Sequence, residues 1–185
     1  MPLYFAYGSN MDVEAMRTRC PRSQALGRAR LMRFSFALMS EGYATIVNNP
    51  RGVVHGVLWD LALSDVRALD AYEGAGRGLY KKIVQPVFRD GAASSRALLY
   101  VGRAGAPGKP QRGYMEGVIA AAREWALPQA YLRELEGLCA GPARVAGAAV
   151  ASVSASRAPE VAERDAAGNI KVRPRFASPL DRSKP

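Results

Sequence analysis

The chain has 185 residues, of which 49% are hydrophobic and 23% charged, a balance typical of a soluble globular domain rather than a disordered or fibrous chain. Its length suffices for one hydrophobic core but not for two independent ones. No apolar run approaches the roughly 18 residues that a membrane-spanning helix needs, and the N-terminus lacks the basic region of a signal peptide. We therefore expect a cytoplasmic protein that does not bind membranes.

The net charge of +10 raises the question of nucleic-acid binding, because clustered Lys and Arg neutralise phosphates. Residues 141–185 hold eight Lys and Arg against four acids, which leaves +6 on the remainder, so the charge is spread along the chain. No nucleic-acid-binding motif is present, and no nucleic-acid partner is expected. Cys20 and Cys139 lie far apart and His55 is the single histidine, so no metal site or cofactor is expected.

The first 61 residues predict strands with one short helix among them. An aromatic and aliphatic strand over residues 3–7 runs into a turn at Gly8. Asp12 then caps a helix that ends before Pro21. Three consecutive antiparallel strands follow, separated by breaks at residues 41–42 and 48–52, and they cover residues 31–39, 44–47 and 53–61.

The next segment predicts a short helix and a hairpin. Ser64 caps the helix, which continues through Glu73 and is stopped by Gly74. Strands over residues 80–88 and 97–101 are joined around an Asp-Gly pair, which favours a tight hairpin turn.

Two helices complete the predicted core, one over residues 114–125 and one that begins at Pro128. Small residues and prolines dominate the basic C-terminal tail, residues 141–185, in which residues 170–176 offer one edge strand. The expected organisation is an α+β domain over residues 1–140. Its mixed, mostly antiparallel sheet curls into a small barrel with flanking helices.

The turn after the first strand is one candidate site. Gly8 lets the backbone turn sharply and expose the N–H groups around Ser9, and such groups can bind a carboxylate or an oxyanion. A plain tight turn supported by Asn10 explains the same residues, so both interpretations stay open.

Glu73 is the second candidate because of its place on the predicted helix. Val66, Leu69 and Glu73 share one face, so the carboxylate points toward the core. Burial and the negative end of the helix dipole both raise the pKa of such a carboxyl, which suits a general base near neutral pH. A buried ion pair with an arginine and a frayed helix end are the alternatives.

Two motifs together resemble the gamma-glutamylcyclotransferase family. Residues 4–10, YFAYGSN, are similar to its YFAYGSN motif, and residues 69–74, LDAYEG, are similar to its LDxxEG motif. Residues 54–59, VHGVLW, are similar to its VxGVxW strand. The resemblance covers roughly residues 3–138, which makes residues 1–140 a gamma-glutamylcyclotransferase-like catalytic domain.

The resemblance implies a mixed α/β barrel, often dimeric, that binds a small gamma-glutamyl compound without a cofactor. Glu73 would be the catalytic base: it takes a proton from the substrate's α-amine, which attacks its own γ-carbonyl and releases 5-oxoproline. The implied substrate-binding residues are Tyr4, Phe5, Ala6, Tyr7, Gly8, Ser9 and Tyr114, with Gly8 and Ser9 ranked first.

Related enzymes of this fold act on gamma-glutamyl amino acids, gamma-glutamylamines, glutathione or gamma-glutamyl-protected antibiotics. The glutathione-specific group carries a YGSL-like loop where this chain has YGSN at residues 7–10, so glutathione fits less well. Intermolecular hydrolysis or transfer of an amide is a second enzymatic reading, and only cyclisation gives 5-oxoproline. The alternative function is a non-catalytic module that binds gamma-glutamyl or carboxylate groups and whose basic tail docks an acidic partner.

Overall fold

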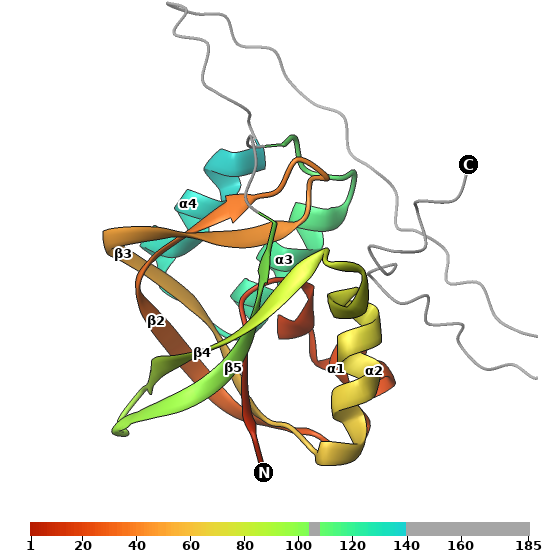
Figure 1. Cartoon of the computed structure of the whole chain (residues 1–185). Coiled ribbons are helices and arrows are strands. Elements are labelled where there is room, and N and C mark those ends of the chain that lie inside the picture. The colour runs from red at the N-terminus through yellow and green to blue at the C-terminus, as the bar shows by residue number, and fades with distance from the viewer. Residues whose placement is uncertain (104–107, 140–185) are drawn as a thin grey trace, which may run out of the picture.

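The computed structural model describes residues 1–103 and 108–139, and in this part of the chain five strands form a closed barrel in the order β1-β3-β2-β4-β5 (Figure 1). β1 pairs parallel with β5, through Tyr4 and Leu98, and the other neighbours pair antiparallel. The predicted mixed, mostly antiparallel barrel is confirmed. The strands are β1 (Leu3–Ala6), β2 (Gln24–Leu38), β3 (Ala44–Asp60), β4 (Tyr80–Arg89) and β5 (Ser94–Gly102).

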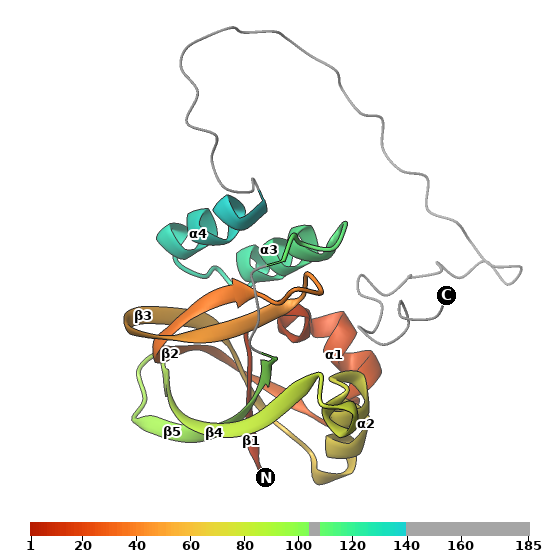
Figure 2. The same cartoon turned by 45° about the horizontal axis from the view of Figure 1, so that its top comes forward.

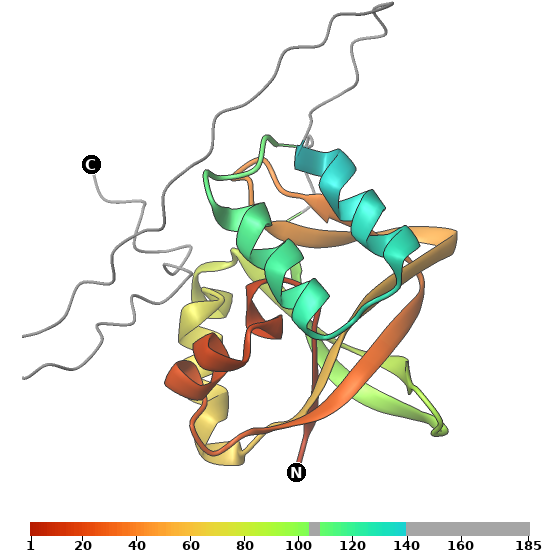
Figure 3. The same ribbon diagram turned by 180° about the vertical axis from the view of Figure 1, so that it is seen from behind.

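Two pairs of α-helices flank the barrel in the described residues. α3 and α4 lie side by side over β2 and β3, while α1 and α2 lie together at another side of the barrel (Figures 2 and 3). None of these helices is long and apolar enough to span a bilayer. The helices are α1 (Val13–Arg19), α2 (Val66–Tyr72), α3 (Tyr114–Glu124) and α4 (Gln129–Cys139), with 3-10 turns η1 (Ser9–Met11), η2 (Leu63–Asp65) and η3 (Ala75–Arg77).

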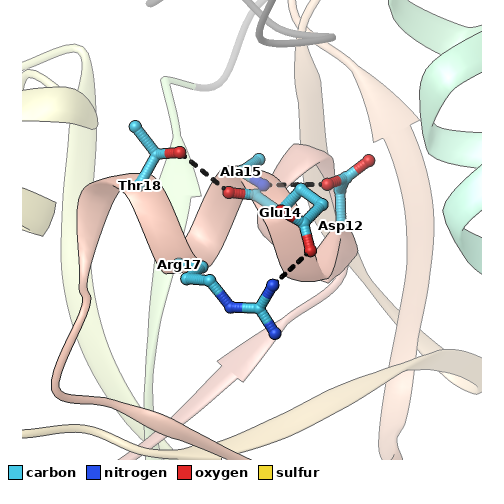
Figure 4. Close-up of polar contacts among 5 residues, drawn as sticks. All are labelled: Asp12, Glu14, Ala15, Arg17 and Thr18. Atoms are coloured by element: carbon cyan, nitrogen blue, oxygen red, sulfur yellow. Dashed lines mark hydrogen bonds and ion pairs between the residues drawn. The ribbon is translucent and has the colours of Figure 1, made fainter. Parts of the chain in front are cut away.

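The helix α1 begins where the sequence predicts. Asp12 is its N-cap, and the Asp12 carboxylate accepts a hydrogen bond of 2.8 Å from the Ala15 N–H (Figure 4). On the exposed side of the helix, Arg17 pairs with Glu14 at 2.5 Å. The cap fixes the direction in which the chain leaves η1, which matters because η1 contributes to the pocket described below.

The predicted division into two strands at residues 48–52 is wrong, because β3 is a single strand through them, although its pairing with β2 skips residues 49–52. β2 pairs Met32 with Val53 and Phe34 with Asn48, so residues 49–52 stand opposite the single residue Arg33. This is a bulge, and Arg33 has a φ of 69°, in the left-handed region. Polar residues and proline are tolerated at a bulge because the hydrogen-bond ladder is already interrupted there.

The predicted cap Ser64 is also wrong. Ser64 lies within η2, and α2 begins at Val66 with Asp65 as its N-cap residue, whose side chain makes no capping bond. The Asp65 carboxylate instead accepts hydrogen bonds of 2.9 Å from the Arg22 N–H and from the Ser23 hydroxyl. Asp65 therefore ties the loop before β2 to the start of α2. The end of the helix is as predicted: Gly74 follows it with a φ of 62°.

The predicted hairpin and the last two predicted helices are present in the described residues. The hairpin of β4 and β5 turns where expected, with Gly91 at a φ of 71°, and α3 and α4 confirm the two predicted helices. β2 begins at Gln24, earlier than predicted, because its first residues are mostly exposed and carry little apolar signal. Residues 141–185 and their predicted edge strand at 170–176 lie outside the described residues.

Candidate active site

A pocket lies where the segment after β1 meets the end of α2. The pocket is small: its cavity volume, measured for the centre of a water molecule, is about 20 Å³, which is room for about one water. Six tyrosines and one carboxylate contribute to its wall, so the lining is aromatic with polar tips. The lining residues are Tyr4, Tyr7, Gly8, Ser9, Asn10, Ala44, Tyr72, Glu73, Tyr80, Tyr100 and Tyr114.

Glu73 reaches this pocket from the C-terminal end of α2. Its side chain is buried, with 7% exposed, and Leu69 on the same face of the helix is fully buried. The Glu73 N–H continues the helical pattern by donating to the Leu69 carbonyl at 3.0 Å. The inward orientation that the sequence predicts for Glu73 is confirmed.

Burial raises the pKa of Glu73 from 4.5 to about 7, because a carboxylate loses hydration in this wall. The positive charge of Arg19 and a hydrogen bond from Asn10 act in the opposite direction and keep the rise moderate. Near neutral pH, Glu73 therefore exists in both protonation states. That balance is what a group needs to take up a proton and return it within one reaction cycle.

Asn10 holds the Glu73 carboxylate directly. Its side-chain Nδ2 donates to Glu73 Oε1 at 2.7 Å and to the Tyr4 hydroxyl at 2.9 Å, while its Oδ1 accepts from Arg19 at 2.6 Å. Asn10 is 2% exposed, and its bonds to Glu73 and Tyr4 form away from bulk water. Beside them, the Ser9 and Tyr72 hydroxyls lie 3.1 Å apart and link η1 to the end of α2.

Gly8 lets Tyr114 come close to the backbone of the loop. A Cβ atom added at Gly8 would lie 3.0 Å from the Tyr114 hydroxyl and 3.1 Å from the Ala44 Cβ, tighter than ordinary contact. The Tyr114 hydroxyl accepts a hydrogen bond of 3.2 Å from the Ala44 N–H. Burial raises the pKa of Tyr114, and a hydrogen bond from the Ser9 backbone partly offsets this rise. A side chain at Gly8 would therefore press on Tyr114 and Ala44, and its absence leaves the backbone at Gly8 open to the pocket that this residue lines.

Two other tyrosine hydroxyls of the pocket bond to the backbone of the barrel strands. Tyr7 donates to the Tyr100 carbonyl, and Tyr80 donates to the Ala44 carbonyl at 2.8 Å. Burial raises the pKa of Tyr4, Tyr7 and Tyr80, so these hydroxyls stay neutral at pH 7. The carboxyl of Glu73 is the titrating group of the pocket in that range.

The structure brings most of the predicted site residues to this pocket. Glu73, Tyr4, Tyr7, Gly8, Ser9 and Tyr114 line it. Phe5 and Ala6 instead lie in the hydrophobic core, and the Phe5 ring and the Ala6 carbonyl close on Gly56 so tightly that Gly56 has no room for a Cβ. Successive side chains of a strand point to opposite faces, which separates Phe5 from Tyr4.

The pocket also contains Asn10, Tyr72, Tyr80 and Tyr100, which are not among the predicted site residues. Asn10 belongs to the YFAYGSN segment, and Tyr72 precedes Glu73, so adjacency to the two motifs was the available signal. Tyr80 and Tyr100 arrive from β4 and β5, and only closure of the barrel brings those strands to the loop after β1. Among the described residues, no group of three or more His, Cys, Asp or Glu side chains is placed to hold a metal ion.

The fold and the pocket define a small barrel protein with a buried carboxylate suited to acid–base chemistry. The family model described as the AIG2-like family matches residues 53–135. The gamma-glutamylcyclotransferase of Mus musculus is 34% identical over 148 residues, which cover 74% of this chain and 78% of the mouse protein. The chain therefore belongs to the gamma-glutamylcyclotransferase family.

Two further comparisons agree with this assignment. The Homo sapiens gamma-glutamylcyclotransferase is 32% identical over the same length, covering 74% of this chain and 78% of the human protein. A solved structure of a gamma-glutamyl cyclotransferase superposes with a TM-score of 0.68 at 29% identity, covering 73% of this chain and 86% of the other. Both the sequence and the barrel are thus similar to enzymes of this name.

Proposed function

We propose that this protein is a gamma-glutamylcyclotransferase that converts a gamma-glutamyl compound into 5-oxoproline and a free amine. The observation that carries the proposal is Glu73, a buried carboxylate with a pKa raised to about 7, which lines the same pocket as Gly8 and Ser9. Family membership supports the reaction class, since the relatives bear this name.

The reaction begins with proton transfer to Glu73. An α-ammonium group has an ordinary pKa of about 8, so transfer to a carboxylate with a pKa of about 7 is uphill by only about 1.4 kcal/mol. A carboxylate at the ordinary 4.5 would make the same transfer uphill by about 5 kcal/mol. The buried position of Glu73 therefore supplies the basicity that the step needs.

The freed amine then attacks the γ-carbonyl carbon of the same molecule and forms the new C–N bond of a five-membered ring. Negative charge develops on the carbonyl oxygen, where the backbone N–H groups around Gly8 and Ser9 would meet it. Collapse restores the carbonyl and breaks the original amide C–N bond, and protonated Glu73 gives its proton to the departing nitrogen. The regenerated carboxylate then takes the second proton from the ring nitrogen and passes it to the released amine, which leaves as an ammonium ion. Because nucleophile and carbonyl are tethered, correct placement provides much of the rate enhancement.

The test is product analysis with a panel of gamma-glutamyl dipeptides, gamma-glutamylamines and glutathione. Cyclisation predicts 5-oxoproline and free amine in equal amounts, whereas hydrolysis would give free glutamate and would contradict the proposed mechanism. The order of rates across the panel identifies the leaving amine. Glu14→Gln is a suitable control, because Glu14 is an exposed carboxylate on α1.

A full-length chain that binds gamma-glutamyl compounds without turning any of them over would favour the non-catalytic module. In that event, deletion of residues 141–185 tests whether the basic tail docks an acidic partner.

The homodimer and the cytoplasmic location expected from the sequence belong to this proposal as well. The resemblance to a family whose members are often dimeric supports the first, and sedimentation of the full chain tests it. Cell fractionation tests the second.

A further inference from the structure

Arg19 lies beside the pocket and contacts Asn10, which is hydrogen-bonded to the catalytic candidate Glu73, and Tyr72, which precedes Glu73 in the chain. It is the last residue of α1, and its Nη1 donates to Asn10 Oδ1 at 2.6 Å. Its guanidinium carbon lies 3.7 Å from the centroid of the Tyr72 ring, within the range of a cation–π contact. Because Asn10 in turn donates to Glu73, one side chain links Arg19 to the carboxylate by hydrogen bonds.

The contact with Arg19 determines which way the Asn10 amide faces. A guanidinium group has donors and no acceptor, so the amide atom that meets it must be the oxygen. The amide nitrogen then points toward Glu73 and Tyr4 and donates to both. With the amide reversed, two donors would meet at Arg19 and two acceptors would meet at Glu73, which is unfavourable for a buried carboxylate.

We propose that Arg19 is a positioning residue, which fixes the amide of Asn10 and through it the orientation of the Glu73 carboxylate. The inference rests on the proposed function, because it assigns Arg19 a part in the cyclisation without contact to the reacting atoms. Holding Oε1 of Glu73 fixes the direction in which the second carboxylate oxygen points. A base held in one orientation meets the substrate amine without a search among rotamers.

Charge supports the same assignment. Around Glu73, burial raises the pKa of Cys20 to about 12 and also raises the pKa of each surrounding tyrosine, so these groups are neutral near pH 7. Asp70, which accepts a hydrogen bond from the Tyr100 hydroxyl, forms an ion pair with Lys82. Arg19 is the cation whose field lowers the pKa of Glu73. The tyrosines around Glu73 are Tyr4, Tyr7, Tyr72, Tyr80, Tyr100 and Tyr114.

Three variants separate orientation, charge and general damage to α1. Arg19→Gln removes the charge and the planar stack, Arg19→Lys keeps the charge and a donor, and Arg17→Gln alters an exposed arginine of the same helix that pairs with Glu14. We expect Arg19→Gln to lower kcat by roughly tenfold to 100-fold, with KM within about threefold of wild type. The midpoint of its kcat–pH profile should rise by about one pH unit.

Arg19→Lys should keep the wild-type midpoint and recover part of kcat, and Arg17→Gln should match wild type. A rise in KM with kcat and the midpoint unchanged would assign Arg19 to substrate binding and overturn the inference. Wild-type kinetics in Arg19→Gln would overturn it too.

A direct titration keeps this test independent of turnover. The ¹³C signal of the Glu73 carboxyl carbon, assigned by its loss in Glu73→Gln, is followed against pH in wild type, Arg19→Gln and Arg19→Lys. A higher midpoint in Arg19→Gln alone supports the positioning network even if no substrate is cyclised, in which case the proposed function fails by itself. Identical midpoints in all three proteins would remove Arg19 from the network.

Discussion

Replacing Glu73 with glutamine is expected to stabilise the folded protein at neutral and alkaline pH. The carboxyl group is buried in the pocket wall, and burial raises its pKa from 4.5 to about 7. In the unfolded chain the same group is hydrated and ionises near its ordinary pKa. Glutamine has a similar shape and keeps an oxygen that can accept the hydrogen bond from Asn10, but it never carries a charge.

The size of the effect follows from the difference between the two pKa values. Below pH 4.5 the carboxyl is protonated in both states, and Glu73 imposes no electrostatic penalty. Between pH 4.5 and about 7 the unfolded chain releases the proton while the folded protein retains it, so the free energy of unfolding falls as pH rises. Above pH 7 the penalty levels out at about 3 kcal/mol.

Urea unfolding of wild type and Glu73→Gln between pH 4.5 and 8.5 measures this difference. The variant should gain stability over wild type by about 3 kcal/mol across that range and no further beyond it. Glu14→Gln provides the control, because the Glu14 side chain is 67% exposed and its replacement should give a small difference that varies little with pH. A difference between Glu73→Gln and wild type that stays constant with pH would refute the raised pKa.

Further predictions concern the pocket and the core. In wild type, kcat should rise with pH through a midpoint near 7, since Glu73 must be deprotonated, and a midpoint near 4.5 in the pH–rate profile would contradict this. Gly8→Ala should lower kcat/KM by about tenfold with little change in Tm, because the added Cβ lies 3.0 Å from the Tyr114 hydroxyl. Tyr114→Phe removes the acceptor for the Ala44 N–H and should raise KM by about twofold to tenfold in initial-rate measurements. Phe5→Ala should reduce the free energy of unfolding in urea by about 3–5 kcal/mol, because Phe5 is fully buried in the core.

Local patterns predict the parts of this fold that local interactions determine. The N-cap Asp12, the helix end at Gly74 and the turn at Gly91 each depend on residues within a few positions of one another, and the structure has all three. The helical face that carries Leu69 also indicates that Glu73 is buried, since helix geometry alone relates the two residues.

The errors arise where long-range pairing overrides local signals. Polar residues and a proline at 48–52 are typical of a loop between two strands. β3 nevertheless continues there, because it pairs with β2 on both sides of the bulge at Arg33. Serine is a common N-cap residue, but α2 begins at Val66, after Asp65. The Asp65 carboxylate accepts hydrogen bonds from Arg22 and Ser23, which are distant in sequence.

The candidate site shows the same division. The residues of the two motifs could be chosen from the sequence because they are contiguous, whereas Tyr80 and Tyr100 join them only through the closed barrel. Arg19 gives no sequence signal at all, because one basic residue at the end of a short helix is ordinary. Its contact with Asn10 exists only once α1 folds back beside η1.

The catalytic role of Glu73 is tested by the release of 5-oxoproline from one gamma-glutamyl substrate at pH 8, measured with purified wild type and with Glu73→Gln. We expect steady release by wild type and a rate at least about 100-fold lower in the variant, since glutamine keeps the shape of the side chain but cannot accept the proton. Equal rates of 5-oxoproline release from the two proteins would contradict the assignment of Glu73 as the general base.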